Sequence, residues 1–332
     1  MWALVAGIAV AVCVTYARLP AEDLYHVSQS GMRGGLSRVL VDLNFPDALI
    51  ALAALGVVAP YLPRAARLLA GLAAALCVVV VVPGVVSQHD LDAKWLNAVP
   101  AIGVALALPL TVLARGVPAE RDRHGDPVRI GLAAGLVLLC APWIAAELGF
   151  YLDGVPVLGS LFQTGEIVSY RGNPPHPAVH HGVHHGLQGL LLVGTALLLS
   201  RIPNRISLFL AFMAAYGIGN IANDAWLEQI AERGWTSWTI PPTLEPALTW
   251  TWLAVLLATP LLWLLWFRQP RPATVPAGGG GRLAGVARET GVTRFRLRGL
   301  APAFGSGRRR AGLIHRQGPG PVTAPSRHRQ RG

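Results

Sequence analysis

The sequence has few charged residues, few cysteines and few methionines. Only 14% of its 332 residues are charged and 53% are apolar, whereas about a quarter of the residues in an ordinary soluble domain carry charge. Cys13, Cys77 and Cys140 each lie inside an apolar run, where a small thiol needs no function, so no disulfide framework is implied. These scarcities exclude an ordinary soluble domain and a disulfide-rich secreted one, and they indicate a polytopic membrane protein.

Acidic residues are scarce as well, with 17 Asp and Glu against 28 Lys and Arg. The basic excess is confined to the C-terminus, because residues 268–332 contain 14 Arg and a single acid, Glu289. The net charge therefore describes a tail, and it does not indicate a nucleic-acid-binding protein. This Arg-, Gly- and Pro-rich tail lacks sustained apolar periodicity, so we predict that 268–332 is disordered, with at most a loose attraction to anionic lipid headgroups.

Long apolar runs are what the sequence has in abundance. A bilayer core of about 30 Å needs about 20 mostly apolar residues as helix, because lipid offers the backbone no hydrogen-bond partner. Eight stretches qualify: 1–17, 45–62, 66–86, 99–114, 130–149, 177–199, 206–226 and 247–267. We therefore predict an all-α fold, a polytopic membrane helical bundle of about eight transmembrane helices over residues 1–267.

The first stretch has a second interpretation. Thr15-Tyr16-Ala17 resembles a signal-peptidase site, which would make 1–17 a cleaved signal peptide. No Lys or Arg precedes the apolar run, however, and this favours an uncleaved span.

Positive charge separates cleanly between alternate connections. One set of connections, together with the tail, holds 22 Lys and Arg and four acids. The other side holds six Lys and Arg and thirteen acids. Short loops rich in Lys and Arg stay in the cytoplasm, so both termini are predicted to be cytoplasmic in a multi-pass plasma-membrane protein. The opposite, outer side is acidic and contains seven of the ten histidines.

The most specific feature is a histidine run at the outer start of the sixth span. It comprises His176, His180, His181, His184 and His185. Pro177 suits a first helical position, so the last four histidines are predicted to be helical. His180 with His184, and His181 with His185, are then spaced to share a metal ion, and Gly182, Gly186 and Gly189 fall on the opposite face, where another helix can pack closely. The alternative is a polar helix start that lies among headgroups and binds nothing.

Other predicted outer ends carry possible partners for these histidines. The fifth span ends at Glu147, and His89 follows the third. The seventh span has a polar stripe about 100° wide made of Tyr216, Asn220, Asn223 and Asp224. Ionisable groups at membrane depth are costly and usually functional, so we select Glu147, Asp224 and His89 from this set.

Three families carry residues of similar kinds. His181-x-x-His184-His185 resembles a histidine box of membrane desaturases and hydroxylases, although those spread several boxes along the chain. His180 and His184, with Ser87, His89 and Asp90, are similar in kind to the zinc site of alkaline ceramidases. Copper-handling membrane proteins also place H-x-x-x-H at outer helix ends. None of these resemblances covers enough of the chain to assign a family.

The leading hypothesis is a zinc site made by His180, His184, His181, His185 and His89. If the protein is an enzyme, zinc-assisted hydrolysis of a lipid-like substrate is expected, with Glu147 or Asp224 as general base. Zinc is favoured because the set offers imidazole and carboxylate without thiolate or a Met cluster, while copper and iron stay open. A cation transporter or metal-handling protein, and a structural or partner-binding membrane protein, are the alternatives.

Overall fold

The computed structural model describes residues 1–18, 29–42, 44–82, 84–86, 92–119, 126–147, 167–168, 176–177, 186–231, 234–244 and 246–268. The chain divides into two units, Met1–Pro272 and Ala273–Gly332. All described residues belong to the first unit. The predicted basic tail, 268–332, lies outside them except for Arg268.

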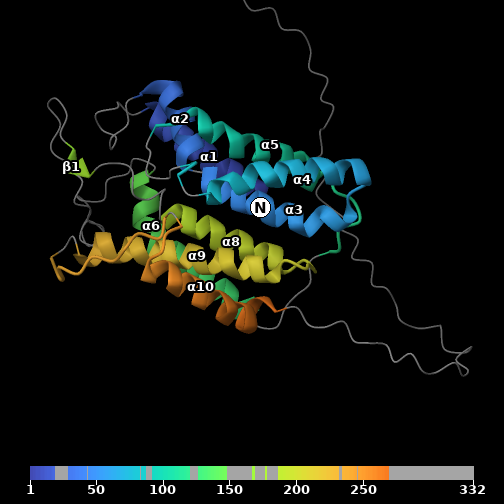
Figure 1. The fold of residues 1–332 in the computed structure, drawn as a ribbon. Coiled ribbons are helices and arrows are strands. Elements are labelled where there is room, and N and C mark those ends of the chain that lie inside the picture. Colours follow the sequence, from blue (N-terminus) through green and yellow to red (C-terminus); the bar gives the residue numbers. More distant parts are fainter. Residues whose placement is uncertain are drawn as a thin grey trace, which may run out of the picture. The chain divides into compact units, whose positions relative to one another are not determined.

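The described residues of the first unit are mostly helical (Figure 1). The α-helices are α1 (Trp2–Arg18), α2 (Gly31–Asp42), α3 (Asn44–Val58), α4 (Arg64–Val78), α5 (Ala98–Val112), α6 (Asp126–Glu147), α8 (Gln188–Ser200), α9 (Ser207–Trp226) and α10 (Trp250–Leu262). Short 3₁₀ or π turns flank them: η2 (Ala59–Tyr61), η3 (Val79–Val81), η4 (Trp95–Asn97), η6 (Leu227–Ala231) and η7 (Trp263–Phe267). Within the described residues the extended pairing is one antiparallel ladder between β1 (Ile167–Val168) and β2 (His176–Pro177).

Helix α3 lies at the centre of the bundle. It packs against α4, α5 and α8, and more lightly against α2 and α9. Its span Asn44–Tyr61 is 67% buried, whereas the spans of α4, α5 and α10 are between 22% and 28% buried. Small residues such as Ala48, Ala51 and Ala53, all fully buried, let the neighbouring helices approach α3 from several sides.

Helices α6, α8, α9 and α10 form a second group. It packs on the first five helices mainly through the contact between α8 and α3. Helices α8 and α9 are antiparallel neighbours joined by a short connection, α10 packs on α9, and α6 packs on α8 (Figure 1). The indole of Trp263 in η7 donates a hydrogen bond of 3.0 Å to Ser207 at the start of α9. This bond ties the end of α10 to the start of α9.

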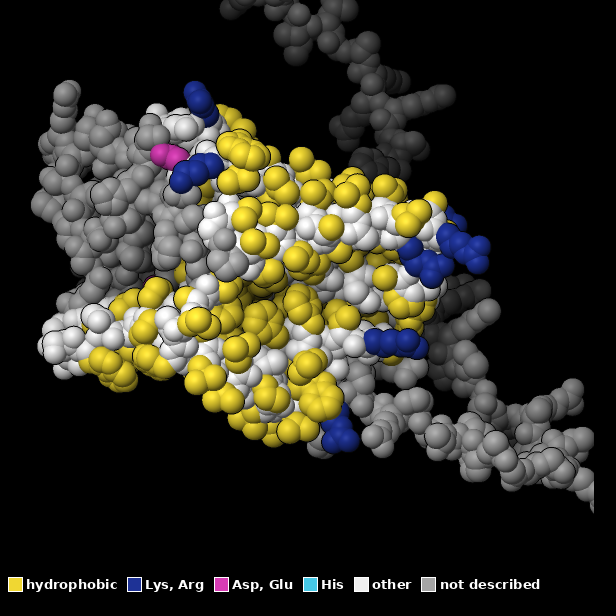
Figure 2. Space-filling model, viewed as in Figure 1, with side chains coloured by type: hydrophobic (Ala, Val, Ile, Leu, Met, Phe, Trp, Pro, Cys, Tyr) yellow, Lys and Arg dark blue, Asp and Glu magenta, His cyan; other side chains and the backbone are white. Residues whose placement is uncertain are grey.

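Arginines gather at one end of the bundle, which we call the arginine end. It is formed by Arg64 at the start of α4, Arg115 after α5, Arg129 in the first turn of α6 and Arg201 at the end of α8. Ile206, just before α9, packs against Gly56 in the last turn of α3. The face in Figure 2 has an almost wholly hydrophobic middle, with Lys and Arg side chains toward its ends. A band of this kind suits a bilayer between two aqueous layers.

Among the described residues, four helical stretches are long and apolar enough to cross a membrane. They are Asn44–Tyr61, Arg64–Val81, Trp95–Val112 and Trp250–Phe267, and each agrees with a predicted span to within a few residues. Trp2–Arg18 and Gln188–Ser200 are apolar but shorter. The helical membrane class predicted from the sequence is therefore supported.

One helix was not predicted, and one local prediction is wrong. Residues Gly31–Asp42, between the first two predicted spans, form helix α2. This polar helix packs on α1, since Gly35 has no side chain and lies against the backbone carbonyl of Cys13. Pro177 is predicted as the first residue of a helix, but it lies in β2 opposite Ile167. The fixed φ of proline suits extended backbone as well as a helix, and the partner strand decides between them.

Candidate metal centre at the converging helix ends

All five predicted metal ligands lie outside the described residues. They are His89, His180, His181, His184 and His185. Glu147 is described as the last residue of α6 without its side chain, and Asp224 is fully described. Among the described residues no group of three His, Cys, Asp or Glu side chains is placed to hold a metal ion. That finding does not bear on the histidine run.

The register between α8 and α9 is set by a pair of glycines. A Cβ added to Gly189 would lie 2.5 Å from the carbonyl oxygen of Gly217 and 2.7 Å from Ile221, and a Cβ added to Gly217 would lie 2.5 Å from the carbonyl oxygen of Gly189. The sequence prediction that Gly189 allows another helix to pack closely is therefore confirmed. Because the two helices are antiparallel, continuing α9 for one turn beyond Ile221 reaches Asp224 on the side of Gly189 from which α8 begins. In the sequence, Gly186 directly follows His185.

Helix α6 ends at the same level. Cys140 of α6 packs with Ile221 of α9, and Ile144, one turn further along α6, packs near Leu187 beside the start of α8. Glu147 closes α6 less than one turn after Ile144. The end of α6, the start of α8 and the end of α9 therefore converge, and we call this region the His-run end.

Asp224 is held in the interior of this region. Asp224 is 1% exposed and lies on α9 between the buried Asn223 and the partly buried Ala225. A carboxylate enclosed by a helical bundle is energetically costly, so it is a functional candidate by default. Of the two acids selected from the sequence, Asp224 is the one whose side chain the structure describes.

The rest of the polar stripe of α9 has a structural explanation that the sequence did not reveal. Thr243 donates to the amide oxygen of Asn220 at 2.7 Å, and Asn223 donates to the carbonyl oxygen of Pro241 at 3.2 Å. Tyr216 donates to the carbonyl oxygen of Leu244. We call residues 241–244 the strap. Thr243 and Leu244 are buried in the bundle, so Asn220 satisfies a buried hydroxyl of the strap and Tyr216 satisfies a buried carbonyl group of its non-helical backbone.

Aromatic packing holds the same region of α9 against its neighbours. The Tyr216 ring stacks on Trp252 of α10 with ring centroids 5.2 Å apart and meets Phe45 of α3 edge-on at 5.6 Å. Pro241 and Pro242 were available in the sequence as signals that the strap is not helical. Its position against α9 was not available.

A second polar contact ties the starts of α3 and α5 together. The amide of Asn44 donates a 2.7 Å hydrogen bond to the carbonyl oxygen of Asn97, and both residues are buried. The sequence suggests a capping role for Asn44 within its own helix. The structure instead uses it to join two helices.

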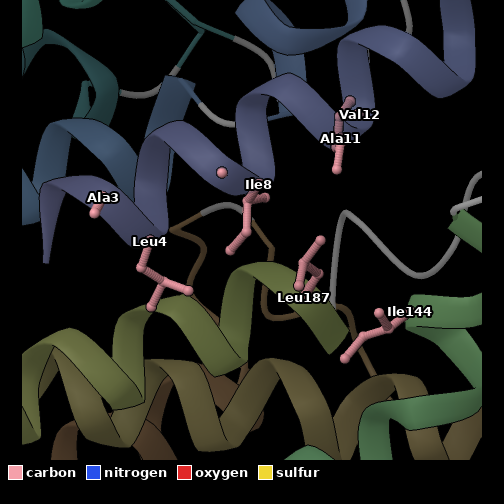
Figure 3. A pocket seen from close by; sticks show the side chains of 8 residues that line it. Ala3, Leu4, Ile8, Ala11, Val12, Ile144 and Leu187 are labelled. Carbon is pink, nitrogen blue, oxygen red and sulfur yellow. The ribbon is translucent and has the colours of Figure 1, made fainter. Parts of the chain in front are cut away.

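An apolar pocket opens beside the His-run end (Figure 3). It has a volume of about 260 Å³ and lies between α1 and the ends of α6 and α8. Leu4, Ile8 and Val12 of α1 line one side, and Ile144 and Leu187 face them across the pocket. Its lining is wholly apolar, so it offers no group that would select a polar ligand.

Comparison with known proteins gives no relative for this chain. No protein-family model matches it, and neither the curated proteins nor the solved structures contain a match.

Proposed function

We propose that this chain is a multi-pass membrane protein with a His-rich zinc site at the His-run end. In this proposal 1–17, 130–149, 206–226 and a span that contains α8 also cross the bilayer, which gives eight spans in the plasma membrane. The arginine end faces the cytoplasm, together with both termini. The charge separation between the two ends supports this orientation.

The convergence of three helix ends carries the proposal. A metal site needs ligands from more than one element, and His180, His181, His184 and His185 lie in a single run. Asp224 lies near the end of α9, beyond the contact with Gly189 and toward the start of α8, and α6 brings the backbone of Glu147 to the same end of the bundle. His89 is assigned as a further ligand from the sequence.

The proposed chemistry is hydrolysis of a lipid-like substrate. Zinc would lower the pKa of a bound water toward neutrality, and Glu147 or Asp224 would accept the proton of that water. The pocket of Figure 3 supports a lipid-like substrate, because an acyl chain between Leu4 and Leu187 would end beside the start of α8. Copper and iron stay open as alternatives.

A cation transporter is the rival proposal, and the hydroxyls toward the arginine end argue against it. A cation path requires polar groups that step through the bundle. Thr195 in α8 donates to the carbonyl oxygens of Leu191 and Leu192 in its own helix. Thr111 in α5 donates to Ala107 at 2.9 Å. Both hydroxyls serve local hydrogen bonds, which favours a one-sided site.

Metal content tests the proposal directly. The detergent-purified protein is compared by mass spectrometry with H180A/H184A and with H315A/H328A, which removes two histidines from the tail. We expect about one equivalent of zinc in the wild type and in the tail variant, and loss of zinc in H180A/H184A. A folded wild type without metal, which gains no thermal stability from added zinc, copper or iron, would overturn the metal site.

A further inference from the structure

A second groove lies at the opposite end of the bundle, between α6 and α8. Its volume is about 240 Å³, and Ile130, Ala133, Leu197 and Leu198 form its apolar walls. Gly194 also lines it, and a Cβ added there would meet nothing within 4 Å. The groove thus has open space beside Gly194, between its apolar walls. Charged residues border it at the arginine end.

Three charged side chains form that border. Arg129 contacts Asp126 at 3.1 Å, and Arg201 contacts the other oxygen of Asp126 at 3.5 Å. Arg129 also donates to the Ser200 hydroxyl and lies over the Phe267 ring at 5.5 Å. Among the described residues of this border, two guanidinium groups therefore share one carboxylate.

The two arginines differ in how exposed their side chains are at the groove. The Arg129 side chain is 4% exposed, and its Nε has no hydrogen-bond partner among the described residues. The Arg201 side chain is 31% exposed, so its charge reaches the mouth. Arg201 adds a positive group beside an apolar groove.

A phosphate group fits this arrangement of charge. Arginine binds phosphate through a planar fork of donors, and basic pockets between transmembrane helices on the cytoplasmic side hold anionic lipid headgroups. The apolar walls continue from the charged border along α6 and α8, which suits an acyl chain attached to that phosphate. A free phosphate ion would make no use of these walls.

We propose that this groove binds an anionic phospholipid of the cytoplasmic leaflet. Its phosphate contacts Arg201 and the edge of Arg129, and part of one acyl chain lies along Ile130, Ala133 and Leu198. The leaflet follows from the proposed orientation. The groove itself is separate from the His-run end and needs no metal.

The test measures thermal unfolding of the full chain in detergent micelles doped with phosphatidylglycerol or with phosphatidylcholine. We expect phosphatidylglycerol to stabilise the wild type and phosphatidylcholine to have little effect. R201Q should lose most of this stabilisation, with an affinity for phosphatidylglycerol about tenfold weaker. R205Q, which changes an exposed arginine outside the groove, should behave as the wild type.

A second variant tests the acyl-chain part without touching the charge. G194L places a side chain in the open space of the groove, and G135L adds the same side chain to α6 at another open position that does not line it. G194L should fold and lose phosphatidylglycerol stabilisation, whereas G135L should retain it. Retention by G194L would contradict the placement of the chain.

Three further results would overturn the proposal. The first is equal stabilisation by both lipids. The second is an equal loss in R201Q and R205Q, which would indicate attraction to basic charge in general. The third is full stabilisation by glycerol 3-phosphate alone, which would make the site one for a soluble phosphate. Zinc content should be unchanged in all four variants, so failure here is distinguishable from failure of the metal site.

Discussion

Gly189 of α8 and Gly217 of α9 lie backbone against backbone, and a Cβ added to either would lie 2.5 Å from the carbonyl oxygen of the other. No side-chain rotation relieves such a contact, because the opposing atom belongs to the main chain. The pair therefore fixes how far each helix slides along the other. It also fixes the level of Asp224 relative to the start of α8.

The first prediction concerns this pair. G189A should force α8 and α9 apart and lower the free energy of unfolding by about 1–3 kcal/mol, the usual cost of overpacking a close contact. Thermal unfolding in detergent measures the effect. The matched control is G194A in the same helix, where the added Cβ meets nothing within 4 Å. G194A should leave stability unchanged or raise it by up to about 1 kcal/mol through helix propensity. Equal effects of both variants would contradict the close packing.

The second prediction concerns the strap. Y216F removes the hydroxyl that donates to the buried carbonyl of Leu244 and keeps the ring that stacks on Trp252. The carbonyl is then left without that donor, so stability should fall by about 1–3 kcal/mol. Limited proteolysis within 235–249 should accelerate as well. Y61F, at a tyrosine that is 37% exposed, is the control and should change neither measurement.

The third prediction concerns Asp224. D224N keeps the shape of the side chain and removes its charge, so zinc affinity measured by equilibrium dialysis should fall about 10- to 100-fold. Stability without zinc should not fall, because a buried charge has been removed. D92N, at a partly exposed residue of the connection before α5, is the control. Unchanged zinc affinity in D224N would remove Asp224 from the site while leaving the histidines to be tested separately.

The fourth prediction concerns orientation. Ser237 and Arg205 are both exposed. Arg205 lies just before the start of α9, and Ser237 lies after its end. In intact cells a membrane-impermeant thiol reagent should label S237C, and it should label R205C only after permeabilisation. Background labelling should be low, because Cys77 and Cys140 are buried and Cys13 is half-buried. The reverse pattern would invert the proposed topology.

The helices of this chain were largely predictable because the signal for each one is local. The predicted stretch 45–62 corresponds to Asn44–Tyr61, and 247–267 contains Trp250–Phe267. Apolar length is a property of the segment itself, and the backbone of such a segment satisfies its hydrogen bonds internally. Helix α2 was missed because it lacks this local apolar signal. It is polar, and packing against α1 stabilises it where composition gives little signal.

The candidate site was predictable only in part. The sequence identified Asp224 as a polar residue on an apolar helix, and the structure buries it near the end of α6 and the start of α8. It did not reveal the partner of Asn220 in the same stripe, whose amide oxygen accepts from Thr243 in the strap. These two residues are 23 positions apart, and no pattern along α9 records such a partner.

The sequence by itself determined the membrane class, the positions of most helices and the separation of charge between their ends, because apolar length and charge are carried by each segment alone. Only the tertiary structure decided which polar groups meet. The Gly189–Gly217 contact sets the level of Asp224, the strap occupies most of the polar stripe of α9, and Arg201 reaches Asp126 and Arg129 across two helices. Each of these depends on the register between packed elements, which is a property of pairs of surfaces and is fixed only when both have folded.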